Sequence, residues 1–163
     1  MKNNKNKSGD EIVHFVEFNP FYLEIFNKYK TEILKLLPEA KIELIGSAAV
    51  PMKGKRELDI LIEVPDKEKA QEILVKNGYG NGPIFGDTSY ATDLKYGIEC
   101  EFHILNKGHK QIKKFKSLVK ELRKNKRLRE NFERFKESCE GLTRREYRER
   151  KAEFLKKFLN ISY

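Results

Sequence analysis

The first hundred residues alternate between short apolar stretches and longer stretches with a helical repeat. Apolar residues at every second position, or in a short continuous run, predict a strand, whereas apolar residues every three or four positions predict a helix. Pro38 ends the first helical stretch, and Gly78 ends the second. The sequence therefore predicts strands at 12–18, 42–45, 58–64, 79–85, 90–94 and 98–105, and helices at about 20–37 and 65–77.

The remainder of the chain shows only the helical repeat. Asn125 separates the first two helical segments, and a Thr-x-x-Glu capping box at Thr143 and Glu146 begins a third. Each segment has one apolar face, which we expect to be buried. The apolar faces comprise Ile112, Phe115, Val119 and Leu122, then Leu128, Phe132 and Phe135, and finally Tyr147, Phe154, Leu155 and Phe158.

The order of these elements predicts an α+β fold. We expect a small mixed β-sheet with flanking helices, followed by a C-terminal helical subdomain. Residues 1–10 show no apolar repeat and are expected to form a disordered tail. The expected organisation is an α/β core at 11–106 and a helical part at 107–163 that packs on the core. A chain of 163 residues is large enough for one such domain.

The net charge of +9 arises from 34 lysines and arginines against 25 aspartates and glutamates. The basic excess is concentrated between Lys107 and Lys157. A basic half suggests an anionic partner, such as RNA or a nucleotide. The alternative is a solvated surface, which we favour for most of these charges because glutamates and arginines are mixed through the final helices.

The apolar runs are too short to cross a bilayer, and no apolar segment follows the basic N-terminus as it would in a signal peptide. We therefore expect no association with a membrane. The two cysteines, Cys100 and Cys139, match no metal-binding spacing and are expected to be buried, reduced thiols. A cytoplasmic location follows from these expectations.

The stretch from Ile45 to Glu63 carries the strongest chemical signal. An apolar run ends in Gly46 and Ser47, whose small turn lets backbone N–H groups approach a phosphate. Asp59 then opens a second apolar run, where a buried carboxylate is costly unless it is paired or binds a metal. The alternatives are an ordinary turn between a strand and a helix, and a salt bridge from Asp59 to Arg56 or a nearby lysine.

Two further groups of residues could complete a site around Asp59. Glu99, Glu101 and His103 alternate with apolar residues, so all three side chains are expected on one face of a strand. Glu101 and His103 together with Asp59 could hold one divalent metal, and the histidine would widen the choice beyond Mg²⁺. The solvent-facing side of an ordinary strand is an equally good interpretation. The basic residues Lys53, Lys55 and Arg56 could hold a phosphate tail or could simply be solvated.

These motifs resemble the GrpB-like family of the nucleotidyltransferase superfamily, which includes DNA polymerase beta. The resemblance rests on the run from Ile45 to Pro51, the basic segment from Lys53 to Arg56, and Leu58-Asp59-Ile60. It extends over residues 12–159 through Val16 to Pro20, Gly78-Tyr79, the strand from Glu101 to Ile104, and the basic helical tail.

The resemblance implies that the Gly46-Ser47 turn meets the triphosphate of a nucleotide, and that carboxylates hold Mg²⁺ or Mn²⁺. It favours Glu101 over Glu99 as the second acid, because Glu101 lies where many members of the family carry a His-x-His strand. The implied activity is metal-dependent transfer of a nucleotide from a nucleoside triphosphate to an unknown acceptor, with Asp59 and Glu101 as catalytic residues.

The sequence departs from the superfamily at one position. An Asp-x-Asp pair is usual on this strand, but here Leu61 stands at the position of the second aspartate. Glu63 lies on the same face at a distance of about 13 Å along the strand, which is too far to replace the missing acid. Two-metal chemistry needs several carboxylates at one place. The alternative function is therefore a non-catalytic module that binds a nucleotide or RNA through a decayed active site.

Overall fold

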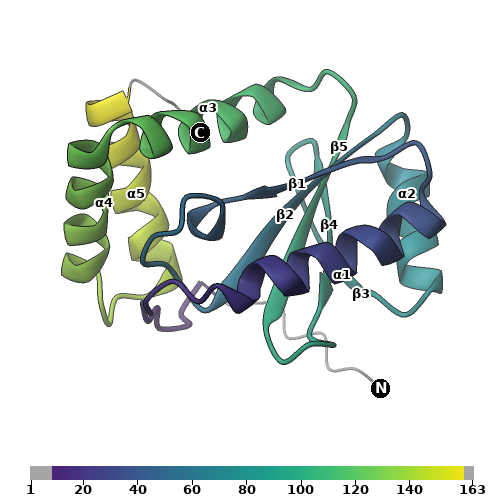
Figure 1. Cartoon of the computed structure of the whole chain (residues 1–163), viewed down its shortest axis with the longest axis horizontal. Coiled ribbons are helices and arrows are strands. Elements are labelled where there is room, and N and C mark those ends of the chain that lie inside the picture. Colours follow the sequence, from purple (N-terminus) through teal and green to yellow (C-terminus); the bar gives the residue numbers. More distant parts are fainter. Residues whose placement is uncertain (1–8, 160–163) are drawn as a thin grey trace.

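The computed structural model describes residues 9–159, except the side chains of residues 83–85, and contains a five-stranded sheet (Figure 1). The strand order is β1-β2-β5-β4-β3, in which β2 and β5 pair in parallel and the other neighbours pair antiparallel. The small mixed sheet is therefore confirmed. The strands are β1 (Lys41–Ile45), β2 (Glu57–Val64), β3 (Gly80–Phe85), β4 (Thr88–Asp93) and β5 (Glu99–Asn106).

Helices cover both faces of the sheet. Helices α1 (Phe21–Leu36) and α2 (Lys67–Lys76) pack on one face, and α3 (Lys110–Lys124) packs on the other. Helix α4 (Lys126–Ser138) and helix α5 (Arg144–Leu159) lie next to each other at the end of α3, at the left of Figure 1. These helices and the mixed sheet confirm the α+β class.

The alternation of side chains along β2 and β5 divides the sheet into two environments. On the face of α1 and α2, Ile60 and Phe102 are fully buried, and the ring of Tyr29 lies 5.2 Å from that of Phe102 in an edge-on contact. On the opposite face, Leu61 and Leu105 lie beneath α3. The polar residues at the start of β2 and β5 share this second face, beyond the area that α3 covers.

The C-terminal helices form their own apolar cluster with the segment that follows β1. Val50 and Met52 from that segment join Phe132 and Leu155, and the ring of Phe132 stacks on Phe154 at 5.1 Å. At the start of α5, the Glu146 carboxylate accepts hydrogen bonds from both the backbone N–H and the hydroxyl of Thr143, which confirms the predicted capping box.

Two local predictions were wrong. Residues 12–18 form only two isolated bridges, Ile12 to Thr143 and Val16 to Gly54, because this segment runs between loops and has no neighbouring strand to pair with. Phe158 lies in the last turn of α5 and is 47% exposed instead of buried. The Gly46-Ser47 turn leads into a single 3-10 turn, Ser47–Ala49.

The expected N-terminal tail, the two cysteines and the hydrophobicity of the helices concern the parts of the chain outside the site. Residues 1–8 of the expected tail lie outside the described residues, whereas Gly9 and Asp10 contact Arg145 of α5. Cys100 and Cys139 are buried free thiols, as expected. Of the helices in the range 9–159, none combines the length and apolar character that crossing a membrane requires.

The packing of Phe132 and Phe158 predicts opposite responses to truncation. Phe132 is 3% exposed, so Phe132→Ala should leave a cavity and lower the free energy of unfolding by about 3–5 kcal/mol. The matched variant Phe158→Ala removes the same atoms from an exposed position and should change it by less than about 1 kcal/mol. Urea denaturation of the two variants measures the difference. Equal effects would show that the C-terminal helices do not pack as described.

Candidate functional site

The pairing of β2 with β5 brings three candidate ligands together. Asp59 lies directly opposite Glu101 in the parallel register, and His103 follows two positions later on the same face. The Nε2 atom of His103 lies 3.0 Å from Oδ1 of Asp59 and 3.6 Å from Oε1 of Glu101. One possible ligand atom from each residue lies within 4.8 Å of the other two.

Two carboxylates and an imidazole at this separation are a suitable donor set for one divalent metal. The Asp59 and Glu101 side chains are 27% and 25% exposed, so an ion held by the three residues could still bind a substrate from solvent. The histidine makes Mn²⁺ as suitable as Mg²⁺. These residues therefore fit the metal that the sequence resemblance implies.

Aromatic packing fixes the orientation of His103. Its ring makes edge-on contacts with Tyr90 on β4 at 4.9 Å and with Phe115 on α3 at 5.3 Å. Nδ1 is buried and has no hydrogen-bond partner among the described residues, whereas Nε2 is directed at the two acids. His103 is only 9% exposed, so the alternative of a solvent-facing strand does not hold for this residue.

The Gly46 turn lies against Asp59. Its φ of 68° belongs to the left-handed region, and a Cβ built at this position would lie 2.9 Å from Oδ2 of Asp59. Only glycine is therefore compatible with both the backbone conformation and the close approach. Ser47 follows as the first residue of the 3-10 turn. The structure thus joins the predicted phosphate-binding turn to the predicted metal site.

Lys136 of α4 reaches the same turn from the C-terminal helices. Its Nζ donates hydrogen bonds to Oγ of Ser47 at 2.5 Å and to the carbonyl oxygen of Lys53 at 2.7 Å, and lies 4.6 Å from the centre of the Phe132 ring. Lys136 is 2% exposed. Burial, followed by repulsion from Lys151, lowers the pKa of Lys136 to about 7.

Lys151 of α5 adds a second cation to this region. Burial and the nearby Lys55 lower the pKa of Lys151, while Asp59 opposes the change. For Asp59 itself, burial favours the neutral acid, but the hydrogen bond to His103 and the charge of Lys55 outweigh it, so its pKa lies below the usual range. The site therefore combines the ionised Asp59 on the sheet with two neighbouring lysines from α4 and α5.

The predicted basic link is largely engaged elsewhere. The Lys53 ammonium pairs with Glu17 at 3.0 Å and Glu137 at 2.5 Å, and Lys55 pairs with Glu57. Arg56 is exposed, and the acid–base contact of Asp59 is with His103 instead of Arg56. The alternative of a salt bridge from Asp59 to Arg56 is therefore wrong. Lys55 stays close enough to Asp59 to stabilise its charge.

Comparison with known proteins assigns the chain to a family. The family model described as GrpB protein matches residues 12–160. The chain belongs to the GrpB family. A UPF0157 protein of Vibrio cholerae serotype O1 is 32% identical over 143 residues, which cover 83% of this chain and 74% of that protein.

Solved structures support the fold of this GrpB family member. The crystal structure of conserved protein GrpB from Enterococcus faecalis has a TM-score of 0.70 at 21% identity and covers 89% of this chain and 99% of its own. The Cid1 poly(U) polymerase with MgGTP bound has a TM-score of 0.51 at 13% identity, and 69% of this chain matches 40% of that one. At such identities the likeness shows a shared nucleotidyltransferase-like fold.

Sequence reasoning missed Glu57 and the two lysines of the C-terminal helices. Glu57 precedes Asp59 by two positions and so shares its strand face, which the alternation already indicated. Its side chain is 7% exposed and pairs with Lys55 and, at 3.3 Å, with Arg144 of α5. Lys136 interrupts the apolar face that contains Phe132, four positions earlier, and this was the only sequence signal for its burial.

The low pKa of Lys136 predicts a specific pH dependence of stability. Above pH 7 the unfolded chain holds a proton at this lysine that the folded protein has released, so the free energy of unfolding should rise with pH until about pH 10. The contribution is at most about 1.4 kcal/mol per pH unit.

Urea denaturation of the wild type and Lys136→Met at pH 7, 8.5 and 10 tests this dependence. The wild type should gain stability relative to the variant as pH increases, because methionine fills the same space without titrating. If the two curves remain parallel over this range, Lys136 keeps an ordinary pKa and is not buried as described.

Proposed function

We propose that this GrpB family protein is a metal-dependent nucleotidyltransferase that transfers a nucleotide from a nucleoside triphosphate to an acceptor hydroxyl. The observation that carries the proposal is the contact between two predicted sites: the Gly46 turn lies against Asp59, whose carboxylate shares one cluster with Glu101 and His103. The fold shared with the Cid1 poly(U) polymerase, which was solved with MgGTP bound, supports this proposal.

Asp59, Glu101 and His103 would hold Mg²⁺ or Mn²⁺. The ion would neutralise charge on the triphosphate as the transfer proceeds. The acceptor oxygen forms a bond to the α-phosphorus, the bond to the β-phosphate oxygen breaks, and pyrophosphate leaves. The proton of the acceptor hydroxyl passes to a carboxylate of the site or to water. Asp59 is suited to holding the ion because its lowered pKa keeps it ionised at neutral pH.

The remaining charge of the triphosphate requires donors on the other side of the site. The missing side chain at Gly46 lets the backbone of the turn pass close to Asp59, so a phosphate bound to N–H groups of this turn would lie beside the metal. Lys136 already donates to the Ser47 hydroxyl and would reach a phosphate bound at this turn. Lys151 would add a second positive charge. Anion binding would relieve the repulsion between these cations.

A second candidate function is a non-catalytic module that binds a nucleotide or RNA. The observation that favours it is Leu61, which takes the second position of the usual Asp-x-Asp pair and is buried beneath α3 with 1% exposure. Glu57 lies on the same face but is neutralised by Lys55 and Arg144. A protein with one metal position would still bind a triphosphate, and pyrophosphate release separates the two candidates.

The site predicts two separable binding defects. Mn²⁺ should strengthen nucleoside triphosphate binding, and Asp59→Asn should abolish that strengthening because it removes a charged ligand. Glu101→Gln should reduce it by about tenfold or more. Lys136→Gln should weaken triphosphate binding both with and without Mn²⁺, because it acts on the phosphates. Calorimetric titration of each variant with a panel of nucleotides, with and without Mn²⁺, measures these effects.

Glu63→Gln is the matched control for the carboxylate variants. Glu63 lies on the same face of β2 about 13 Å from Asp59, so this change should leave metal-dependent binding intact. Pyrophosphate release with a panel of acceptors would identify an active transferase, and binding without release would identify the non-catalytic module. If no nucleotide binds more tightly with metal, this cluster is not a nucleotide site in either candidate, and Asp59 serves only to pair with His103.

A further inference from the structure

Helix α3 carries an unusual concentration of positive charge. Its sequence holds seven lysines or arginines and a single acidic residue, Glu121, whereas α4 and α5 each mix their basic residues with three glutamates. The sequence argument for a solvated surface rested on mixed charges, and it does not apply to this helix. The positive charge of α3 therefore calls for a separate explanation.

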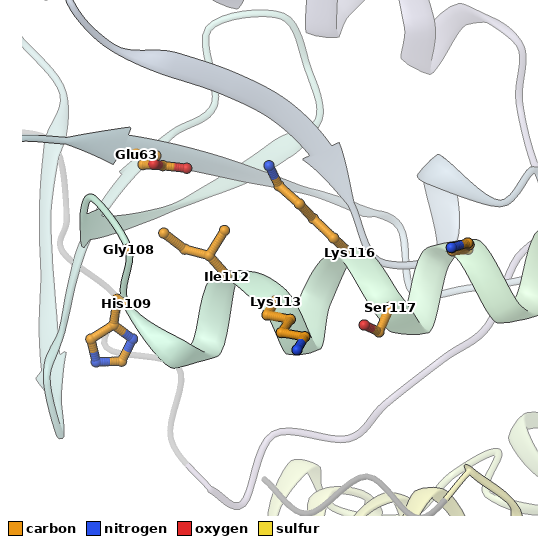
Figure 2. Close-up of a pocket in the computed structure, with 8 residues that line it drawn as sticks. Glu63, Gly108, His109, Ile112, Lys113, Lys116 and Ser117 are labelled. Atoms are coloured by element: carbon orange, nitrogen blue, oxygen red, sulfur yellow. The ribbon is translucent and has the colours of Figure 1, made fainter.

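The basic side of α3 borders a groove along the edge of the sheet. Figure 2 shows one end of the groove, where Lys113, Lys116 and Ser117 project from the helix and Glu63 lies on the strand opposite. The hollow at this end has a volume of about 340 Å³. A second hollow of about 420 Å³ continues along β1, and the two share Lys116 and Lys120.

The groove leads to the candidate site. Its second hollow is lined by Leu44 and Ile45, the last residues before the Gly46 turn, and by Arg123 and Lys124 at the end of α3. The Nε atom of Arg123 donates a hydrogen bond of 2.7 Å to the carbonyl oxygen of Ala49, within the 3-10 turn that follows Gly46. One end of the groove is thus joined to the phosphate-binding turn.

The lysines along the groove are spaced so that they could contact successive negative charges of a polymer. Lys116, Lys120 and Lys124 are exposed and recur every four residues, so about 6 Å separates their positions along the helix axis. Of the described residues that line the two hollows, only His109, at the end away from the Gly46 turn, carries a ring on which a base could stack. Lys116 pairs with Glu43 at 2.7 Å, an exposed ion pair of low energy that a phosphate could replace.

We propose that this groove binds the sugar-phosphate backbone of a single-stranded nucleic acid and directs its end to the Gly46 turn. That the groove binds a nucleic acid follows from its charge and shape. That this nucleic acid is the acceptor of the transferred nucleotide rests on the proposed function. Because the contacts are to phosphates, binding is independent of base sequence and depends strongly on salt.

The test compares two triple variants by fluorescence anisotropy with a labelled 12-nucleotide RNA, titrated between 50 and 300 mM NaCl. Lys116→Gln/Lys120→Gln/Lys124→Gln removes three phosphate contacts, so the slope of log K against log salt should become less steep by about 2, and affinity at 100 mM salt should fall roughly 10- to 100-fold. The control Lys28→Gln/Lys30→Gln/Lys35→Gln makes the same charge change on α1, across the sheet, and should keep nearly the wild-type slope.

Three results would overturn the proposal: equal losses in both triple variants, wild-type binding in the α3 variant, or poly-glutamate of the same charge binding as tightly as the RNA. Equal affinity for a duplex of the same length would overturn the single-strand assignment. RNA binding that survives in a protein without metal-dependent nucleotide binding would contradict the proposed function and leave the groove intact.

Discussion

The parallel pairing of β2 with β5 is the constraint on which the candidate site depends. The register places Asp59 directly beside Glu101, and the pleat then turns His103 to the same face. A shift of one residue in β5 would move Glu101 and His103 into the apolar core against α1 and would bring Phe102 to the acid face. The burial of Phe102 and Ile104 on the other face therefore fixes the position of the acids.

The C-terminal helices supply the charge that the sheet lacks. Glu57 on β2 pairs with Arg144 of α5, which ties this helix to the strand that carries Asp59. Lys136 and Lys151 lie near the carboxylates, and both have lowered pKa values, mainly because their charged forms are poorly solvated there. A bound metal ion would balance the negative charge of the carboxylates, and the triphosphate would balance the positive charge of the lysines. In the proposed site, the helical part would supply the positive charge.

The sequence was sufficient for the sheet, the glycine turn and the acids, because strand alternation and a lone acid in an apolar run are local signals. Lys136 could not be assigned to the site, since its contact with Ser47 spans 89 residues and depends on how α4 packs. Residues 12–18 misled because alternation reports burial on one side of an extended segment, and here Val13 is buried against Cys139 and Tyr147 without a neighbouring strand. The pairing of Lys53 with Glu17 and Glu137 could not be predicted either, because both glutamates are distant from it in the sequence.

In the proposed function, Asp59, Glu101 and His103 hold one metal ion that also contacts a triphosphate at the Gly46 turn. The most direct measurement is anomalous diffraction at the manganese edge from crystals grown with Mn²⁺ and a non-hydrolysable nucleoside triphosphate. We expect one manganese peak between the three side chains, with phosphate oxygens on the ion and the remaining phosphates near Ser47 and Lys136. An ordered triphosphate elsewhere, or no manganese at these side chains, would contradict the proposed function.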